Sequence, residues 1–159
     1  MATVVTTAAL VYGLVAWING TGMIEPVWPP SQLELRSTET LGIARDIQRC
    51  YEMLGHEPPP LEHAVQAAEG MHGMYCADRV TIDAESVDLE TPAGQAVLVH
   101  ELVHWLQDYN GDADAAECVA AREYDAYMVH REWQKQMGLE LYPDEFTIMT
   151  RSQCPAAME

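Results

Sequence analysis

Residues 97–107 read VLVHELVHWLQ, an HExxH motif set in an otherwise apolar run. The run predicts a buried helix, in which His100 and His104 lie one turn apart on one face and can bind a single zinc ion. Glu101 lies beside that position, where a carboxylate can accept a proton from zinc-bound water. The alternative is two core histidines that are satisfied by hydrogen bonds. We favour zinc, because burying two histidines and a glutamate without a partner is costly.

A third ligand is needed, and the sequence offers two glutamates for it. In the metzincin pattern HExxHxxGxxH the glycine and last histidine would fall at Gln107 and Asn110, which excludes that class. Glu117 and Glu123 follow on the next predicted helix, and each has an alanine three residues later. Either could face the first helix, so a helical wheel leaves both open. Cys118 lies nearby, but a cysteine at a helix start is more often a core or disulfide residue.

The segment VLVHELVHWLQ, followed by EYDAY at residues 123–127, resembles the gluzincin-type metallopeptidases. It is especially similar to small zincin-like domain families of bacteria and phages that read HELVHxLQ and then ExEAY. Residues 73–83 also resemble the strand pair that these domains place before the active helix. The similarity spans residues 75–133, and HExxH is its specific part.

The resemblance implies that His100, His104 and Glu123 bind zinc and that Glu101 is the general base. We prefer Glu123 to Glu117 also because the short link after the first helix predicts an antiparallel hairpin. In such a hairpin Glu123 returns to the level of His100, and its small neighbours permit a close approach of the two helices. Gluzincins often carry aspartate directly after the alanine of ExxA, whereas this chain has a tyrosine there, at position 127.

The remaining pattern predicts one α+β domain over residues 1–159, in which the helices pack on a small, mainly antiparallel sheet. Helices are expected at residues 7–18, 38–54, 92–108 and 114–137. Thr91 and Pro92 open the third of these as N-cap and first helical residue, and Ser37 or Thr38 caps the second.

Strands are expected in a β-rich segment from Ala64 to Glu85. Its two alternating runs flank Ala77-Asp78, a plausible hairpin turn. Residues 32–36 and 146–149 are expected to form two further short strands.

The charge balance and the N-terminal segment exclude some functions. Eight Lys and Arg stand against 25 Asp and Glu, a formal net charge of −17, which disfavours binding to nucleic acid or to an anionic membrane. No charged residue precedes Glu25, but polar residues and glycines interrupt this uncharged stretch, and no basic residue stands ahead of its apolar part. We therefore expect a buried or half-buried helix there, with neither a membrane span nor a signal peptide.

The four cysteines, Cys50, Cys76, Cys118 and Cys154, contain no CxxC pair. A thiolate zinc site is therefore improbable, and the spacing leaves two disulfides and four buried thiols both open. The compartment stays open for the same reason: a soluble protein of this kind could be cytoplasmic, extracellular or virion-associated.

These patterns predict a zinc-dependent metallopeptidase that acts on a peptide or protein substrate. His130, Tyr109, Tyr124 and Tyr127 are weaker candidates for stabilising an oxyanion. One alternative is a non-catalytic zinc-binding component with protein partners, for example in a virion or secreted assembly. Another is an intracellular regulatory peptidase that cleaves one partner. The presence of Glu101 favours catalysis, because zinc binding alone does not require it.

Overall fold

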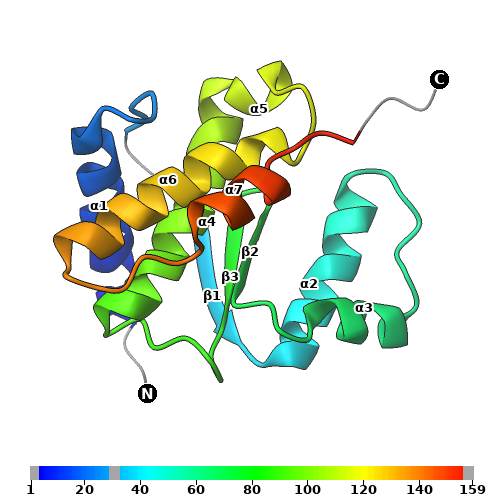
Figure 1. Cartoon of the computed structure of the whole chain (residues 1–159). Helices are drawn as coiled ribbons and strands as arrows, with labels where there is room; N and C mark the ends of the chain where they lie inside the picture. Colours follow the sequence, from blue (N-terminus) through cyan, green and yellow to red (C-terminus); the bar gives the residue numbers. More distant parts are fainter. Residues whose placement is uncertain (1–3, 29–32, 156–159) are drawn as a thin grey trace.

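The computed structural model describes residues 4–28 and 33–155, and its helices surround a small sheet (Figure 1). The elements in chain order are α1 (Val4–Thr21), β1 (Glu34–Thr38), α2 (Thr40–Met53), α3 (Leu61–Ala68), β2 (Gly73–Cys76), β3 (Arg79–Asp83), α4 (Pro92–Asn110), α5 (Asp112–Ala115), α6 (Ala121–Gln136) and α7 (Glu145–Arg151). The predicted α+β class is confirmed.

The sheet has the strand order β1-β3-β2 and is mixed. β2 and β3 form the expected antiparallel hairpin, and its turn residues Ala77 and Asp78 have φ angles of 49° and 65°. β1 lies parallel to β3, with Glu34 opposite Arg79. We expected a mainly antiparallel sheet; the parallel pair arises because α2 and α3 carry the chain back before the hairpin begins. The predicted start of β1 at residue 32 lies outside the described residues.

The two faces of β3 contact two groups of helices, because successive side chains of a strand point to opposite faces of the sheet. Val80 and Ile82 are fully buried in the core that includes α1, α4 and α6. On the opposite face Thr81 donates a hydrogen bond to the buried Asp46 of α2 at 2.8 Å. Figure 1 shows α2 and α3 on one side of the sheet and α1, α4 and α6 on the other.

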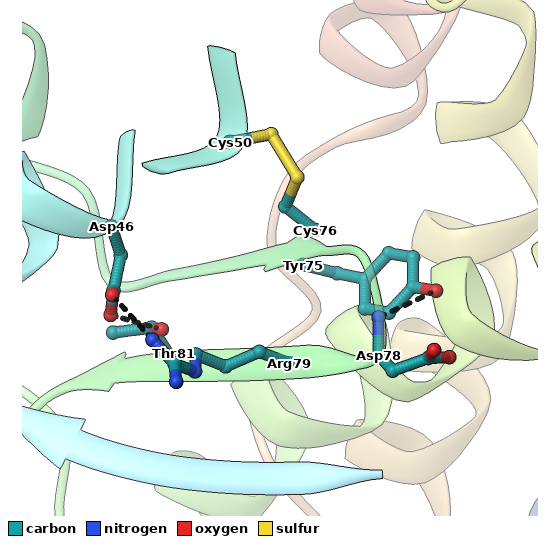
Figure 2. Close-up of a disulfide and its surroundings, with 7 residues drawn as sticks. All are labelled: Asp46, Cys50, Tyr75, Cys76, Asp78, Arg79 and Thr81. Carbon is teal, nitrogen blue, oxygen red and sulfur yellow. Dashed lines mark hydrogen bonds and ion pairs between the residues drawn. A yellow bond between two sulfur atoms is a disulfide. The ribbon is translucent and has the colours of Figure 1, made fainter. Parts of the chain in front are cut away.

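Asp46 fixes α2 to the sheet through charged hydrogen bonds. Its carboxylate accepts from Arg36 at 2.9 and 3.0 Å. It also accepts from Arg79 at 2.8 Å and from Thr81 (Figure 2). A disulfide between Cys50 and Cys76 then ties α2 to β2 (Figure 2). Together these contacts hold β2 in place from the α2 side, so that its other face is free to border the site described below.

The core is built mainly on α1 and α4. α1 is the buried or half-buried helix expected in the N-terminal segment, because Val11, Leu14, Val15 and Ile18 are all buried. A second, smaller cluster joins α2 to α3 and contains Ile43, Ala44, Ile47, Ala64 and Ala68. Trp105 and Trp133 are buried, whereas Trp28 is 56% exposed.

Two boundary predictions near α2 and α3 are wrong. Neither Ser37 nor Thr38 caps α2, because both belong to β1; the N-cap is Glu39, which makes no side-chain capping bond. Residues 64–68, predicted to be β-rich, lie in helix α3, where Ala64 and Ala68 face α2. Their four-residue spacing is helical and matches an apolar face that needs a helical partner.

Two further predictions fail near the C-terminus. The single helix expected over residues 114–137 is divided into α5 and α6, because Ala116 adopts an extended conformation with ψ of 137°. The strand expected at residues 146–149 is part of helix α7. Asp144 is the N-cap of α7, and its side chain accepts from the backbone N–H of Thr147 at 2.8 Å.

The second disulfide joins Cys118, in the stretch between α5 and α6, to Cys154, just after α7. All four cysteines are thus paired, which resolves the choice that spacing left open. Along the described ranges 4–28 and 33–155, no helix combines the length and the apolar character needed to cross a bilayer.

Candidate metal centre

Helix α4 carries the HExxH motif, and local signals fix where it begins and ends. Its N-cap is Thr91, whose hydroxyl accepts from the N–H of Gly94 at 3.1 Å, and Pro92 is the first helical residue, as predicted. A methyl group at Gly94 would collide with the carbonyl oxygen of Asp88, so this position requires glycine. The helix runs two residues further than predicted and ends at Gly111, which has a φ of 85°.

His100, His104 and Glu123 converge on one point between α4 and α6. The two Nε2 atoms are 3.2 Å apart, and each lies 3.1 Å from an oxygen of Glu123. Ligand atoms held 2.0–2.1 Å from a tetrahedral ion are about 3.3 Å apart. The donor atoms therefore stand at the mutual spacing of three ligands around one zinc-sized ion, and these three residues could hold a metal ion.

The orientation of His104 is fixed by Gln107. Nδ1 of His104 donates to the carbonyl oxygen of the Gln107 side chain at 3.0 Å, and the Gln107 amide donates to the backbone carbonyl of Arg122 at 3.0 Å. Because the amide group must donate to that carbonyl, its oxygen is the atom that accepts from His104. Nδ1 therefore carries the proton in neutral His104, and the lone pair of Nε2 points at the candidate site.

The surroundings of His100 differ from those of His104. Its Nδ1 is buried and has no hydrogen-bond partner among the described residues. The ring of Tyr127 packs against His100 with 4.6 Å between centroids, and His130 lies 6.0 Å away. The position at which gluzincins often carry aspartate thus holds an aromatic ring that fixes His100 by contact.

Glu101 lies beside the cluster under the edge strand β2. It is 7% exposed, and a methyl group added at Gly73 would lie 3.0 Å from its Cγ and 3.1 Å from its Oε1. Gly73 therefore leaves the space that the Glu101 side chain occupies. Burial raises the pKa of Glu101 above its ordinary value, although His100 and His104 oppose this effect.

The neighbouring titratable groups respond to burial and to one another. For Glu123 burial alone would raise the pKa, but hydrogen bonds with His100 and His104 hold it below its ordinary value. For His104 burial lowers the pKa, and contacts with the two glutamates outweigh that effect and raise it. Burial lowers the pKa of His130 to about 4, so this imidazole is neutral at pH 7.

The cluster borders a cavity of about 640 Å³. One face of α6 supplies Glu123, Tyr127, His130 and Gln134 to its wall, at helical spacings of four, three and four residues. Other parts of the lining come from β2, including Gly73 and Tyr75, and from residues 142–143 and Arg151 near the C-terminus.

The structure separates the candidates that the sequence left open. Glu123, and not Glu117, lies with the two histidines; Glu117 is exposed in the non-helical stretch before α6. Cys118 is in a disulfide, so its sulfur is not a metal ligand. Of the oxyanion candidates, Tyr127 and His130 line the cavity, whereas Tyr109 and Tyr124 are exposed side chains outside its lining.

Sequence reasoning missed several residues of the site. Gln107 follows His104 by three residues, so helical spacing alone could have placed the two side chains together. Gly73 and Arg151 gave no such signal, because each reaches the cavity from an element distant in sequence.

The described residues thus define an α+β protein with a His-His-Glu candidate metal centre in the wall of a cavity. A family model described as Domain of unknown function (DUF6647) matches residues 55–158, more than half of the chain, and the chain belongs to this family. The match includes every residue of the candidate centre. Comparison with curated proteins and with solved structures found no match.

Proposed function

We propose that this protein is a zinc-dependent peptidase that hydrolyses amide bonds in a peptide or protein substrate. His100, His104 and Glu123 would hold the metal, and Glu101 would be the general base. The observation that carries the proposal is the convergence of these three donors next to a buried glutamate and an open cavity. The resemblance of HExxH and EYDAY to gluzincin-type metallopeptidases supports the same chemistry.

The donor set fits zinc better than calcium or magnesium. Two imidazole nitrogens and one carboxylate are ligands typical of catalytic zinc, whereas the two alkaline-earth ions prefer oxygen ligands only. Gln107 holds His104 in the tautomer that a metal ligand requires. A bound zinc ion would polarise a substrate carbonyl and acidify water at its open position.

Glu101 has the position and the environment of a group that moves protons. Its side chain lines the cavity next to the three donors, and burial raises its pKa above the ordinary value. A carboxylate with a raised pKa can accept a proton from the attacking water and return it to the amine that leaves. The neutral His130 and the hydroxyl of Tyr127 border the same space and can donate hydrogen bonds to substrate oxygens.

The cavity has a volume suited to several residues of a substrate. Its 640 Å³ falls within the range of about 300–1,000 Å³ that is usual for ligand pockets. Its lining includes Gly73, Met74 and Tyr75 of β2, which is an edge strand of the sheet.

The two disulfides support an oxidising site of action, such as the cell exterior or the surface of a secreted assembly. Disulfides persist in such compartments and are rare in the cytosol. This favours an exported peptidase over an intracellular regulatory one. Titration of free thiols in protein taken from its native compartment would test the point: no reactive thiol is expected, and four would contradict it.

Glu101→Gln is the variant that tests catalysis. The amide should preserve folding and zinc binding, because Glu101 is not among the three donors, and it should abolish peptide hydrolysis, because it cannot accept a proton at neutral pH. Zinc content, thermal unfolding and cleavage of a broad peptide library would be measured side by side with wild type. Equal cleavage by the variant, or no cleavage by wild type, would contradict the proposal and favour a non-catalytic zinc-binding component.

A further inference from the structure

Arg151, the last residue of α7, is the one lysine or arginine among the described residues that line the cavity. The chain has 8 basic residues against 25 acidic ones, so carboxylate partners are abundant. Arg36, Arg122 and Arg131 each pair with one, and Arg79 pairs with two. Arg151 forms no ion pair within the described part of the chain, although it borders the candidate catalytic centre.

The guanidinium of Arg151 is held at a defined place in the wall. Its Nη1 donates to the hydroxyl of Tyr127 at 2.9 Å, and its Cζ lies 5.9 Å from the centre of that ring. The same Tyr127 ring packs against His100, with 4.6 Å between the ring centroids. A single aromatic ring thus separates Arg151 from a candidate metal ligand.

Most of the hydrogen-bonding capacity of Arg151 is left for a ligand. An arginine has five N–H donors in a planar fork, and the bond to Tyr127 uses one of them. Arg151 is an exposed residue, so its remaining donors are open to solvent or to a ligand. Two acidic residues, Glu101 and Glu123, stand among the described lining residues, and both are assigned to the candidate centre. Among the described lining residues, therefore, no carboxylate forms an ion pair with Arg151.

We propose that Arg151 binds a carboxylate of the substrate, supplied either by an acidic side chain or by a peptide C-terminus. The fork of a guanidinium matches a carboxylate in a two-bond arrangement, and such charged pairs are stronger than neutral hydrogen bonds. This inference rests on the proposed peptidase function and names the class of substrate for it. The distances of 5.9 Å from Arg151 to the Tyr127 ring and 4.6 Å from that ring to His100 limit how far Arg151 lies from the candidate centre. Because an extended residue spans about 3.3–3.6 Å, the carboxylate should lie within about three residues of the bond that is cleaved.

The overall charge of −17 does not prevent this preference. Exposed charges are screened over about 8 Å at physiological ionic strength, so distant acidic groups act weakly on a bound ligand. A carboxylate in contact with Arg151 is much closer than that. The preference should therefore persist at roughly 0.15 M salt, the physiological ionic strength.

The test measures equilibrium binding to the zinc-free protein in excess chelator, so the probes are not cleaved during the measurement. Two matched pairs of fluorescent hexapeptides serve as probes of the full chain by fluorescence anisotropy. In the first pair, blocked at both ends, the two peptides differ only in having glutamate or glutamine at one position. This pair is made once for each position along the peptide. In the second pair, without acidic side chains, a free C-terminus is compared with a carboxamide. Wild type, Arg151→Gln, Arg151→Lys and the control Arg45→Gln are compared; Arg45 is exposed on α2, outside the cavity lining.

Wild type and Arg45→Gln should bind the anionic member of one pair about tenfold more tightly, which corresponds to about 1.4 kcal/mol. Arg151→Gln should reduce the ratio to within about twofold, and Arg151→Lys should retain part of it, since the charge remains without the planar fork. The pair that responds identifies the source of the carboxylate. Equal binding of both members by wild type, or an unchanged ratio in Arg151→Gln, would overturn the inference.

The outcome also separates this inference from the proposed function. A charge preference that depends on Arg151, in a protein that cleaves no peptide, would support the carboxylate site and contradict the peptidase. Cleavage without any charge preference would support the peptidase and overturn the role of Arg151. If Arg151→Gln unfolds at a lower temperature than wild type, the comparison between wild type and Arg151→Lys still decides the result.

Discussion

Replacing Gln107 with leucine should weaken metal binding, although Gln107 is not one of the three donors. Its side chain accepts from Nδ1 of His104 and donates to the Arg122 carbonyl, both at 3.0 Å, and it is 2% exposed. Leucine has a similar size but cannot form either bond. Loss of a group that orients a metal ligand typically costs 10- to 100-fold in affinity, or about 1.4–2.7 kcal/mol. The two groups left unpaired should also lower apoprotein stability by about 1–3 kcal/mol.

Competition with a zinc chelator measures the affinity, and urea unfolding in excess chelator measures the stability of the apoprotein. Gln95→Leu is the matched control, because Gln95 lies on the same helix and its amide donates to the Leu89 carbonyl at 3.1 Å, away from the centre. Only the Gln107 variant should lose zinc affinity. Zinc binding as tight as wild type in Gln107→Leu would refute the orienting role of this side chain.

Two further variants test the surroundings of the centre. Gly73→Ala should retain zinc but reduce hydrolysis and cost about 1–3 kcal/mol in unfolding free energy, because the methyl group crowds Glu101. Gly13→Ala is the control, since a methyl group there meets nothing within 4 Å. Equal peptidase activity of the two variants would contradict the crowding. Removal of the Cys118–Cys154 disulfide by a double alanine substitution should lower stability by about 4 kcal/mol, given its separation of 36 residues. Urea unfolding of the variant and of wild type without reductant checks this, and identical curves for the two would contradict it.

The parts of the site that lie on one helix were predictable from sequence. The spacing of His100 and His104 is a property of the α-helix itself, and Thr91, Pro92 and Gly111 mark the ends of α4 through local backbone chemistry. The inner face of α1 follows from the same periodicity. Such features depend on neighbours within a few residues, which is the range over which a sequence pattern carries information.

To choose Glu123 over Glu117 from geometry, one must know how the chain runs between α4 and α6. A helical wheel treats residues 114–137 as one continuous helix, whereas the extended Ala116 separates α5 from α6 and changes which face meets α4. The resemblance to gluzincins pointed to Glu123 independently of that path. The placement of Glu123 with the histidines agrees with it, while metal binding itself stays a prediction.

Long-range packing explains the remaining differences. The residues of α7 are compatible with a short strand by composition, but the Asp144 cap and the burial of Ile148 fix a helix. The parallel pairing of β1 with β3 depends on α2 docking through Asp46, which no local pattern reveals. Arg151 reaches the cavity for the same reason, because α7 packs against α6 only in the folded chain.

The most direct test of the metal centre is the zinc content and affinity of the full chain and its ligand variants. Wild type and Glu117→Ala should bind one zinc ion per chain with equal affinity, since Glu117 is exposed and remote from the histidines. His100→Ala, His104→Ala and Glu123→Ala should each lose bound zinc or bind it far more weakly, because each removes one of three donors. Zinc retained at full affinity in Glu123→Ala, or in both histidine variants, would contradict the assignment of these residues as the metal centre.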